Sequence, residues 1–406
     1  MNRVRSVDVL RGFALMCMVL VHFIIYFGDS TAMRSWLYFA LNHLLADWGA
    51  AGFLMMMGIS QVLSAAKTPD ASEWFLFKKA IVRTLYLIAL GLLLSTLAFG
   101  PWRMFEWDIL PVMGFATLVL YFCRFLPSWL LVVLMVIMAL ITPWLRSLID
   151  PIPIWGEAFM ATPVISDYLP GLYVDPTGDL PVIWRLDAIA QGFLLTGYFP
   201  IFPWLIFPLM GFLMGRRMVA QRFRQDLLAL VAFGLLLLIL GLGAALASTR
   251  IPGASAVTGY LAPLSFYPDS FTMVLLQLSV SLVVFSALYY WYDVRRGQQA
   301  KVGFVTNLYN RTSRFALTFY FAHYLLIGWT LLIVYLVTGQ YRIFDLMGAW
   351  PALLCGLVAL ALLETMLAVW ERKGGRFSLE WILAWLTAWI APPAHASAHR
   401  LSAHRT

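Results

Sequence analysis

The chain has 406 residues and a formal net charge of +8, with 62% hydrophobic and only 12% charged residues. Soluble domains average about 25% charged and about 45–50% apolar residues, so this composition excludes a water-soluble fold. The cysteines Cys17, Cys123 and Cys355 stand singly in apolar stretches, so neither a disulfide framework nor a zinc motif is predicted. The basic residues lie in short segments between apolar stretches, which argues against nucleic-acid binding.

Apolar stretches of about 20 residues, the length that crosses about 30 Å of hydrocarbon, recur along the whole chain. The first follows Arg3 and Arg5 but lacks a cleavage site, so a retained helix is predicted rather than a signal peptide. The pattern predicts an all-α, polytopic transmembrane bundle of about ten spans, in a single domain over residues 1–391. The predicted spans are 8–28, 41–66, 80–100, 108–126, 128–146, 198–215, 227–248, 271–292, 315–338 and 348–370.

Charge is distributed unevenly between the two sides of these spans. If the amino terminus is cytoplasmic, most of the 28 Lys and Arg residues fall in cytoplasmic segments. The outer loops then keep only Arg34, Arg103, Arg146, Arg185, Arg250 and Arg342. This positive-inside pattern predicts a multi-pass protein of a bacterial inner membrane with its amino terminus in the cytoplasm.

Two segments differ from the pattern of helices and short loops. The extracytoplasmic loop 147–197 holds prolines, aromatics and carboxylates, so a packed lid is predicted there. The apolar stretch 379–390 is short for a span and rich in tryptophan, which predicts a helix on the cytoplasmic interface; an eleventh span is the alternative. The tail 392–406 is predicted to be disordered, although its three histidines leave metal binding as an alternative.

Ionisable residues are rare inside the predicted spans, where each costs at least about 2.5–3.5 kcal/mol at mid-bilayer. On the first span, Asp8, Arg11 and His22 share one helical stripe, and about 16 Å of helix axis separates Arg11 from His22. His22 is surrounded by apolar neighbours, so a functional site is favoured over a structural hydrogen bond. The residues singled out inside the spans as candidates are His22, His43, Asp47, Asp108, His323 and Glu364.

The second span brings a histidine and a carboxylate together. His43 and Asp47 are one helical turn apart, and a carboxylate that fixes the tautomer of an imidazole can make it a general base. The alternative is that the two merely satisfy each other near water. Asp108 is favoured as the cap of a helix start. His323 and Glu364 fit a functional role and a helix-bridging role equally well.

The segment RSVDVLRGFA at residues 5–14, followed by MVLVH at 18–22, carries a specific resemblance. It resembles the opening of the heparan-α-glucosaminide N-acetyltransferase-like family of membrane acyltransferases, in its bacterial form. Other segments agree with this family in order, at 46–58, 108–114, 198–204 and 320–323.

The resemblance implies a helical domain that passes acetyl groups from cytoplasmic acetyl-CoA to the amine or hydroxyl of a sugar across the membrane. It also implies that Asp8 and Arg11 shape the cytoplasmic end of the donor site. A membrane histidine and Asp47 would then serve acyl transfer, and the resemblance leaves His22 and His43 as alternatives for that histidine. No metal is implied.

Acyl transfer from a thioester needs a deprotonated acceptor, a place for developing negative charge and exclusion of water. Arginine suits phosphate recognition, so Arg83 and Arg216 are predicted to join Arg11 around the CoA phosphates. His22 or His43 would deprotonate a sugar or glycan acceptor that arrives from outside. No residue is assigned to the developing negative charge.

Other functions fit the same residues. A proton-coupled transporter or flippase is the main alternative, with His22, Asp47, His323 and Glu364 as its proton relay. A non-catalytic membrane scaffold is the third reading, and it predicts that acetyl-CoA does not stabilise the protein. Beyond the lipid bilayer, assembly as a homo-oligomer is left open.

Overall fold

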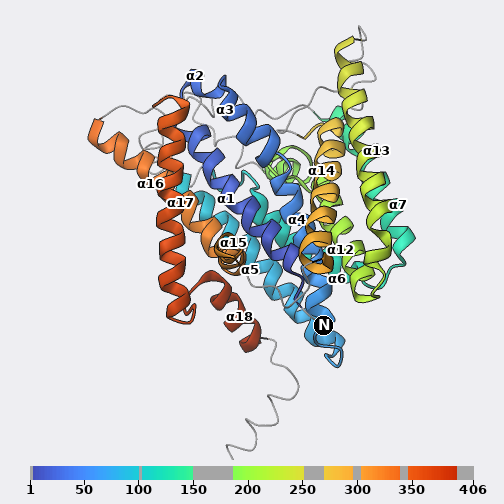
Figure 1. The fold of residues 1–406 in the computed structure, drawn as a ribbon. Helices are drawn as coiled ribbons and strands as arrows, with labels where there is room; N and C mark the ends of the chain where they lie inside the picture. The colour runs from blue at the N-terminus through green and yellow to red at the C-terminus, as the bar shows by residue number, and fades with distance from the viewer. Residues whose placement is uncertain are drawn as a thin grey trace, which may run out of the picture.

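The computed structural model describes residues 3–99, 103–149, 186–250, 269–295, 303–338 and 346–390. Over these ranges the fold is an all-α, polytopic helical bundle, and no strand occurs within them (Figure 1). The predicted tail 392–406 and most of the predicted lid, residues 150–185, lie outside the described residues.

Each predicted span falls on a helix, and eight segments in the described part of the chain are long and apolar enough to cross a membrane. These are α1 (Arg5–Phe27), α5 (Glu73–Phe99), α7 (Ser128–Ser147), the run Leu186–Val219, α13 (Phe223–Arg250), α14 (Phe271–Tyr289) extended by η7 (Tyr290–Arg295), α16 (Ala316–Thr338) and α17 (Ala349–Arg372). The run comprises α10 (Leu186–Gln191), η5 (Gly192–Thr196), α11 (Ile201–Trp204) and α12 (Ile206–Val219).

Two predicted spans are shorter helices. They are α4 (Gly49–Ala65), of 17 residues, and α6 (Ile109–Cys123), of 15 residues. At 1.5 Å per residue, α6 covers about 22 Å, less than the about 30 Å of a hydrocarbon core. The π-helix η1 (Ala40–Ala46) lies directly before α4 and completes the second predicted span.

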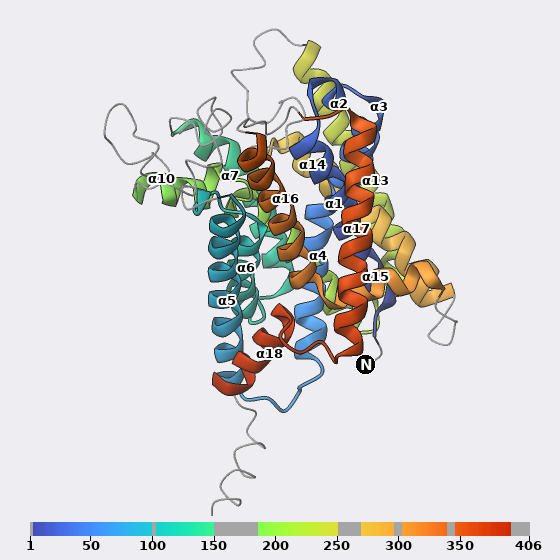
Figure 2. The same cartoon turned by 90° about the vertical axis from the view of Figure 1, so that its left-hand side faces the viewer.

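Helix α1 runs through the middle of the bundle and packs against α4, α14, α16 and α17 (Figures 1 and 2). The amphipathic helix α15 (Phe304–Arg314), which lies outside the predicted spans, crosses it near its start. A Cβ atom on Gly12 would stand 2.2 Å from the carbonyl oxygen of Tyr309, so only glycine permits this crossing. Ser313 then donates a hydrogen bond of 2.9 Å to Asp8.

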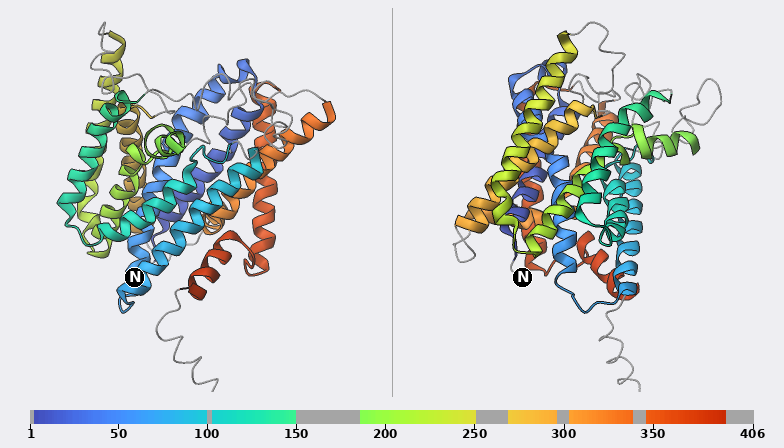
Figure 3. Two further views of the ribbon diagram at one scale, coloured as in Figure 1. Left: turned by 180° about the vertical axis from the view of Figure 1, so that it is seen from behind. Right: turned by 90° about the vertical axis from the view of Figure 1, so that its right-hand side faces the viewer.

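Small residues also let α4 and α12 pack closely. A Cβ atom on Gly211 would stand 1.9 Å from the carbonyl oxygen of Met55, so the two backbones are in direct contact. On either side of this core, the pair α5 and α6 and the pair α13 and α14 lie on opposite sides of the bundle, as the right-hand view of Figure 3 shows. The α1–α4 contact therefore lies between these two helix pairs.

The two ends of the bundle differ. We call the end at which α1 begins, and at which α18 (Leu379–Ile390) lies, the basic end; the opposite end, with α2 (Ser30–Met33) and α3 (Trp36–Phe39), is the distal end (Figures 1 and 2). Helix α18 has 12 residues, about 18 Å, so it is too short to cross a bilayer by itself. Its Glu380 accepts hydrogen bonds from the backbone of Leu317 and Thr318 at the start of α16.

Candidate functional site

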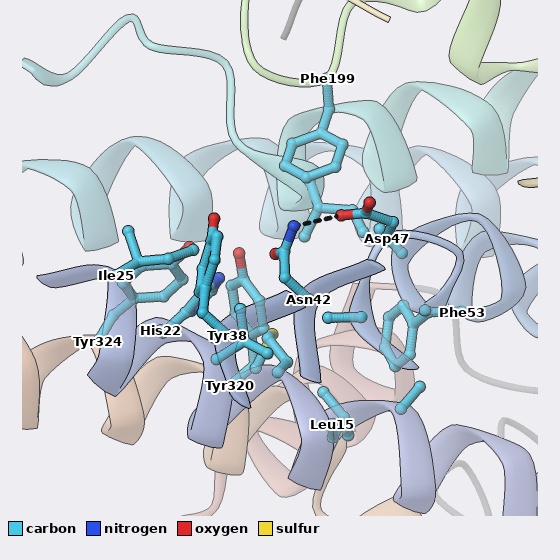
Figure 4. Close-up of a pocket in the computed structure, with 17 residues that line it drawn as sticks. Leu15, His22, Ile25, Tyr38, Asn42, Asp47, Phe53, Phe199, Tyr320 and Tyr324 are labelled. Carbon is cyan, nitrogen blue, oxygen red and sulfur yellow. Dashed lines mark hydrogen bonds between the residues drawn. The ribbon is translucent and has the colours of Figure 1, made fainter. Parts of the chain in front are cut away.

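Helices α1, η1, α4 and α16 enclose a cavity of about 180 Å³ toward the distal end. We call it the His22 cavity, and Figure 4 shows His22, Tyr38, Asn42 and Asp47 around it. Its remaining lining is mostly apolar and aromatic. The fold thus brings His22 of α1 and Asp47, which precedes α4, to one cavity.

His22 is joined to a second histidine. Its Nδ1 lies 3.1 Å from Nε2 of His323, which comes from α16, and the two rings stack with centroids 5.3 Å apart. Nδ1 of His323 is hydrogen-bonded to the backbone carbonyl of Tyr320. Within the described residues, Nε2 of His22 has no hydrogen-bond partner, and the ring of His22 borders the cavity. His323 is 0% exposed and is absent from the described lining of the cavity.

Asp47 is held by two side chains from the preceding π-helix. Asn42 donates to one carboxylate oxygen at 2.9 Å, and Nδ1 of His43 lies 2.7 Å from the other. The wider π-helical turn places Asn42 beside Asp47, because the backbone N–H of Asp47 bonds the carbonyl of Asn42. The His43–Asp47 pair predicted from spacing is therefore present. The side chain of His43 is 48% exposed and is absent from the described lining of the cavity.

Tyr38 is a polar group of the cavity that sequence reasoning missed. It lies in the short helix α3, and Ser35, the N-cap of that helix, accepts a hydrogen bond from the Tyr38 backbone. The side chain lines the His22 cavity, and its hydroxyl makes no hydrogen bond to any described residue. In the sequence it is one tyrosine in a segment between two spans, with no spacing that marks it. Only the fold turns it toward His22 and Asp47.

Asp269, just before α14, is a carboxyl that sequence reasoning also missed. It is 1% exposed; Gln277 donates to one of its oxygens at 3.4 Å, while the other oxygen has no hydrogen-bond partner in the described structure. Burial raises the pKa of Asp269 well above its usual range, and Arg146 opposes this shift. The negative charge of Asp47 raises the pKa further, so the two carboxyls interact electrostatically.

Asp108 caps α6 and also connects that helix to α16. One carboxylate oxygen accepts from the backbone N–H of Ile109 at 2.7 Å, which satisfies a free donor of the first turn. The other accepts from the hydroxyl of Tyr320 at 2.5 Å. Tyr320 lines the His22 cavity, and its backbone carbonyl bonds His323, so the cap of α6 helps to set the position of this part of α16.

A second cavity, of about 200 Å³, lies at the basic end between α4, α5, α6 and α12. We call it the Arg83 cavity; four of its lining residues are basic, namely Lys79, Arg83, Arg124 and Arg216. Nε of Arg83 is buried without a hydrogen-bond partner in the described structure, and no described carboxylate pairs with this side chain. The charge of Arg11 lies near enough to repel it. An unpaired cation of this kind suits an anionic ligand.

The other basic residues around this cavity already have partners. Arg216 donates to the carbonyls of Cys123, Arg124 and Leu126, so it satisfies the last turn of α6. Arg124 pairs with Glu73. These contacts leave Arg83, together with Lys79, as the cations with the most unused hydrogen-bonding capacity.

Asp8, Arg11 and Glu364 stand outside the described lining of both cavities. Arg11 donates to Ser60 of α4 at 2.5 Å, and Asp8 accepts from Arg3 as well as from α15. Glu364 accepts from Thr312 and lies 3.5 Å from Arg311, so it connects α17 to α15. The predicted proton relay is therefore not one continuous chain, because Glu364 is bound near the basic end, away from the histidines.

The family model described as the catalytic domain of heparan-alpha-glucosaminide N-acetyltransferase matches residues 3–246, more than half of the chain. The chain belongs to this family. The predicted membership is confirmed, and it gives the protein the general function of a transmembrane acetyltransferase. The family uses acetyl-CoA as its donor. A comparison with curated proteins gives no match.

The part of the chain that matches this acetyltransferase family includes most of both cavities. His22, Tyr38 and Asp47 lie within it, and so does Arg83. Helix α16, with His323, lies beyond it. Among the described residues, no group of three His, Cys, Asp or Glu side chains is arranged to hold a metal ion.

Proposed function

We propose that the protein transfers an acetyl group from acetyl-CoA, bound at the basic end, to an amine or hydroxyl of a sugar or glycan in the His22 cavity. One observation carries the proposal. In a member of an acetyltransferase family, one cavity is lined both by His22, whose Nε2 has no partner among the described residues, and by Asp47, which is fixed by a hydrogen bond from Asn42. The positive-inside pattern supports a cytoplasmic basic end, which gives the donor site access to cytoplasmic acetyl-CoA.

The Arg83 cavity is the proposed site of the CoA phosphates. The unpartnered Nε of Arg83 fits an anionic oxygen, and Lys79 adds a second positive charge. About 16 Å of α1 separates Arg11 from His22, a length similar to the reach of a pantetheine arm. In this proposal Asp8 and Arg11 stabilise the basic end, where they join α1 to α15 and α4.

Acetyl-CoA supplies a thioester, whose C–S bond breaks as the bond from the acceptor to the acetyl carbon forms. His22 Nε2 takes the proton that the acceptor amine or hydroxyl loses and gives it to the departing CoA sulfur, so the proton count balances. The hydroxyl of Tyr38 supplies a donor for the negative charge that develops on the acetyl oxygen. The apolar lining excludes water from the reaction.

The shape of the His22 cavity supports a sugar as the acceptor. Its aromatic walls, Phe53 and Phe199, suit the apolar faces of a sugar ring, while Asn42 and Asp47 offer polar groups to its edge (Figure 4). The family's description names a glucosaminide, which favours an amino sugar. Asp47, kept in place by Asn42 and His43, then accepts from the acceptor and orients it.

The test is acetyl transfer by purified protein in liposomes, with acetyl-CoA supplied on one side and amino and neutral sugars on the other. His22→Ala is expected to reduce the rate by about 10²–10⁴-fold, the usual contribution of a general base. Thr365→Val is the control, because this exposed hydroxyl bonds only the carbonyl of Ala361 in its own helix. Full activity of His22→Ala would refute the assigned base. Proton-coupled solute uptake without acetyl-CoA turnover would instead support the transporter.

A further inference from the structure

His323 is the most deeply buried ionisable group beside the His22 cavity. It is 0% exposed, and within the described residues its ring nitrogens contact only Nδ1 of His22 and backbone carbonyl oxygen of α16. No described carboxylate touches either histidine. A charged imidazolium in such a place would carry a large desolvation penalty without a compensating ion pair, so the pair is neutral.

The hydrogen bonds of a neutral pair determine both tautomers. A backbone carbonyl only accepts, so the nitrogen of His323 that meets the Tyr320 carbonyl, Nδ1, must carry the proton. A neutral imidazole has one N–H, which leaves Nε2 of His323 as an acceptor. Nδ1 of His22 must then be the donor across the 3.1 Å contact. The one remaining nitrogen of His22, Nε2, keeps its lone pair and faces the cavity.

We propose that His323 is a positioning residue that fixes His22 in the Nδ1–H tautomer. The hydrogen bond orders the ring of His22 and presents an unprotonated Nε2 to the acceptor. The expected effect on the rate of acetyl transfer rests on the proposed function. A carboxylate performs this orienting task in many hydrolases. Here a neutral imidazole performs it without placing a negative charge in the membrane interior.

Replacing the carboxylate by an imidazole has a chemical consequence. A carboxylate would stabilise the imidazolium form of the base, whereas His323 offers only a lone pair. The imidazolium that forms when His22 takes the proton from the acceptor is therefore not stabilised by its partner. The proton is expected to pass directly to the leaving sulfur, so that proton uptake and release belong to one transfer event.

The tautomer can be measured directly, because ¹⁵N chemical shifts distinguish a protonated from an unprotonated imidazole nitrogen. The full chain has six histidines, so ¹⁵N-histidine labelling in lipid nanodiscs gives a small set of signals. His22→Asn and His323→Gln assign the two signals of the pair. We expect both His22 and His323 in the wild-type protein to carry their proton on Nδ1.

Two substitutions distinguish the hydrogen-bond acceptor of His323 from the volume of its side chain. His323→Phe fills the space but removes the acceptor, so His22 should move to the Nε2–H tautomer and acetyl transfer should fall by about 10²–10⁴-fold. His323→Gln keeps an acceptor oxygen, so it should hold His22 in the Nδ1–H tautomer and retain at least about ten times the activity of His323→Phe. Thr330→Val is the matched control on α16, because its hydroxyl bonds only the carbonyl of Leu326.

The outcomes are distinct from those that test the acetyltransferase proposal. A wild-type spectrum in which Nε2 of His22 is protonated overturns the positioning role, whatever the activity. An unchanged His22 tautomer in His323→Phe overturns it as well. If wild-type protein transfers no acetyl group but shows the Nδ1–H tautomer, the proposed function fails and the geometry of the pair stands. If His323→Phe does not fold, the wild-type and His323→Gln spectra still decide the question.

Discussion

Replacing Arg83 by methionine is expected to raise the stability of the ligand-free protein and to reduce the stabilisation that acetyl-CoA adds. Without ligand, Nε of Arg83 is buried and unpartnered in the described structure, and the charge of Arg11 repels the guanidinium. A buried polar group left unsatisfied costs about 1–3 kcal/mol, and more when it is charged. Methionine has a similar length and no charge, so the ligand-free variant should gain about 1–3 kcal/mol in its free energy of unfolding.

With acetyl-CoA the stability advantage of the variant should shrink, because the wild-type protein gains more from the ligand. A ligand at 100 times its Kd stabilises the wild-type protein by about 2.7 kcal/mol. Loss of one charge-assisted hydrogen bond, worth about 1.5–3 kcal/mol, weakens binding about 10- to 150-fold. At the same ligand concentration, Arg83→Met should then gain only about 0.3–1.4 kcal/mol from acetyl-CoA.

The assay is thermal unfolding in detergent at several acetyl-CoA concentrations, with calorimetric titration for Kd. Arg217→Met is the matched control, because Arg217 is also a basic-end arginine but pairs with Asp226 at 2.6 Å near the surface. This pair is exposed to solvent, so its loss should change stability little and leave the acetyl-CoA effect unchanged. The reasoning about Arg83 is refuted if Arg83→Met is less stable than the wild-type protein without ligand and keeps the full stabilisation by acetyl-CoA.

Two further predictions concern Tyr38 and Asp269. Tyr38→Phe should lower kcat by about 10²–10³-fold, the usual effect of losing one oxyanion donor. The KM for acetyl-CoA should change little in steady-state assays, and an unchanged kcat would exclude the donor role. For Asp269 the folded-state pKa is raised, so its contribution to stability is complete below the ordinary value of about 3.9 and is lost as pH rises through the raised pKa. Asp269→Asn should remove this loss, so the variant should be the more stable protein at pH 7. Unfolding temperatures between pH 5 and 8 measure the difference, and parallel curves for the two proteins would contradict it.

Family membership was readable from the sequence because its motifs are short and continuous. The segment around Asp8, Arg11 and His22 is contiguous, and it falls inside the matched range. The roles of single residues are less accessible in this way. Arg216 looked like a phosphate ligand by residue type alone, yet in the structure its guanidinium bonds the carbonyls at the end of α6.

The sequence by itself determined the features that depend on neighbours along the chain. Composition and apolar length determined an all-α membrane bundle, since a chain crossing lipid must satisfy its backbone hydrogen bonds within each segment. Local spacing predicted the His43–Asp47 pair, and residue type favoured Asp108 as a helix cap. Helix α15 was missed because its apolar face is narrow and its polar residues resemble those of a loop.

Only the tertiary structure decided which side chains meet across helices. His22 and His323 are 301 residues apart, and no local period links them. The orientation of Tyr38 toward the cavity and the unpartnered state of Arg83 likewise depend on how α3 and α5 pack against their neighbours. Helical periodicity determines which face of one helix is apolar, but the partner of that face is set by close packing of small residues such as Gly12 and Gly211.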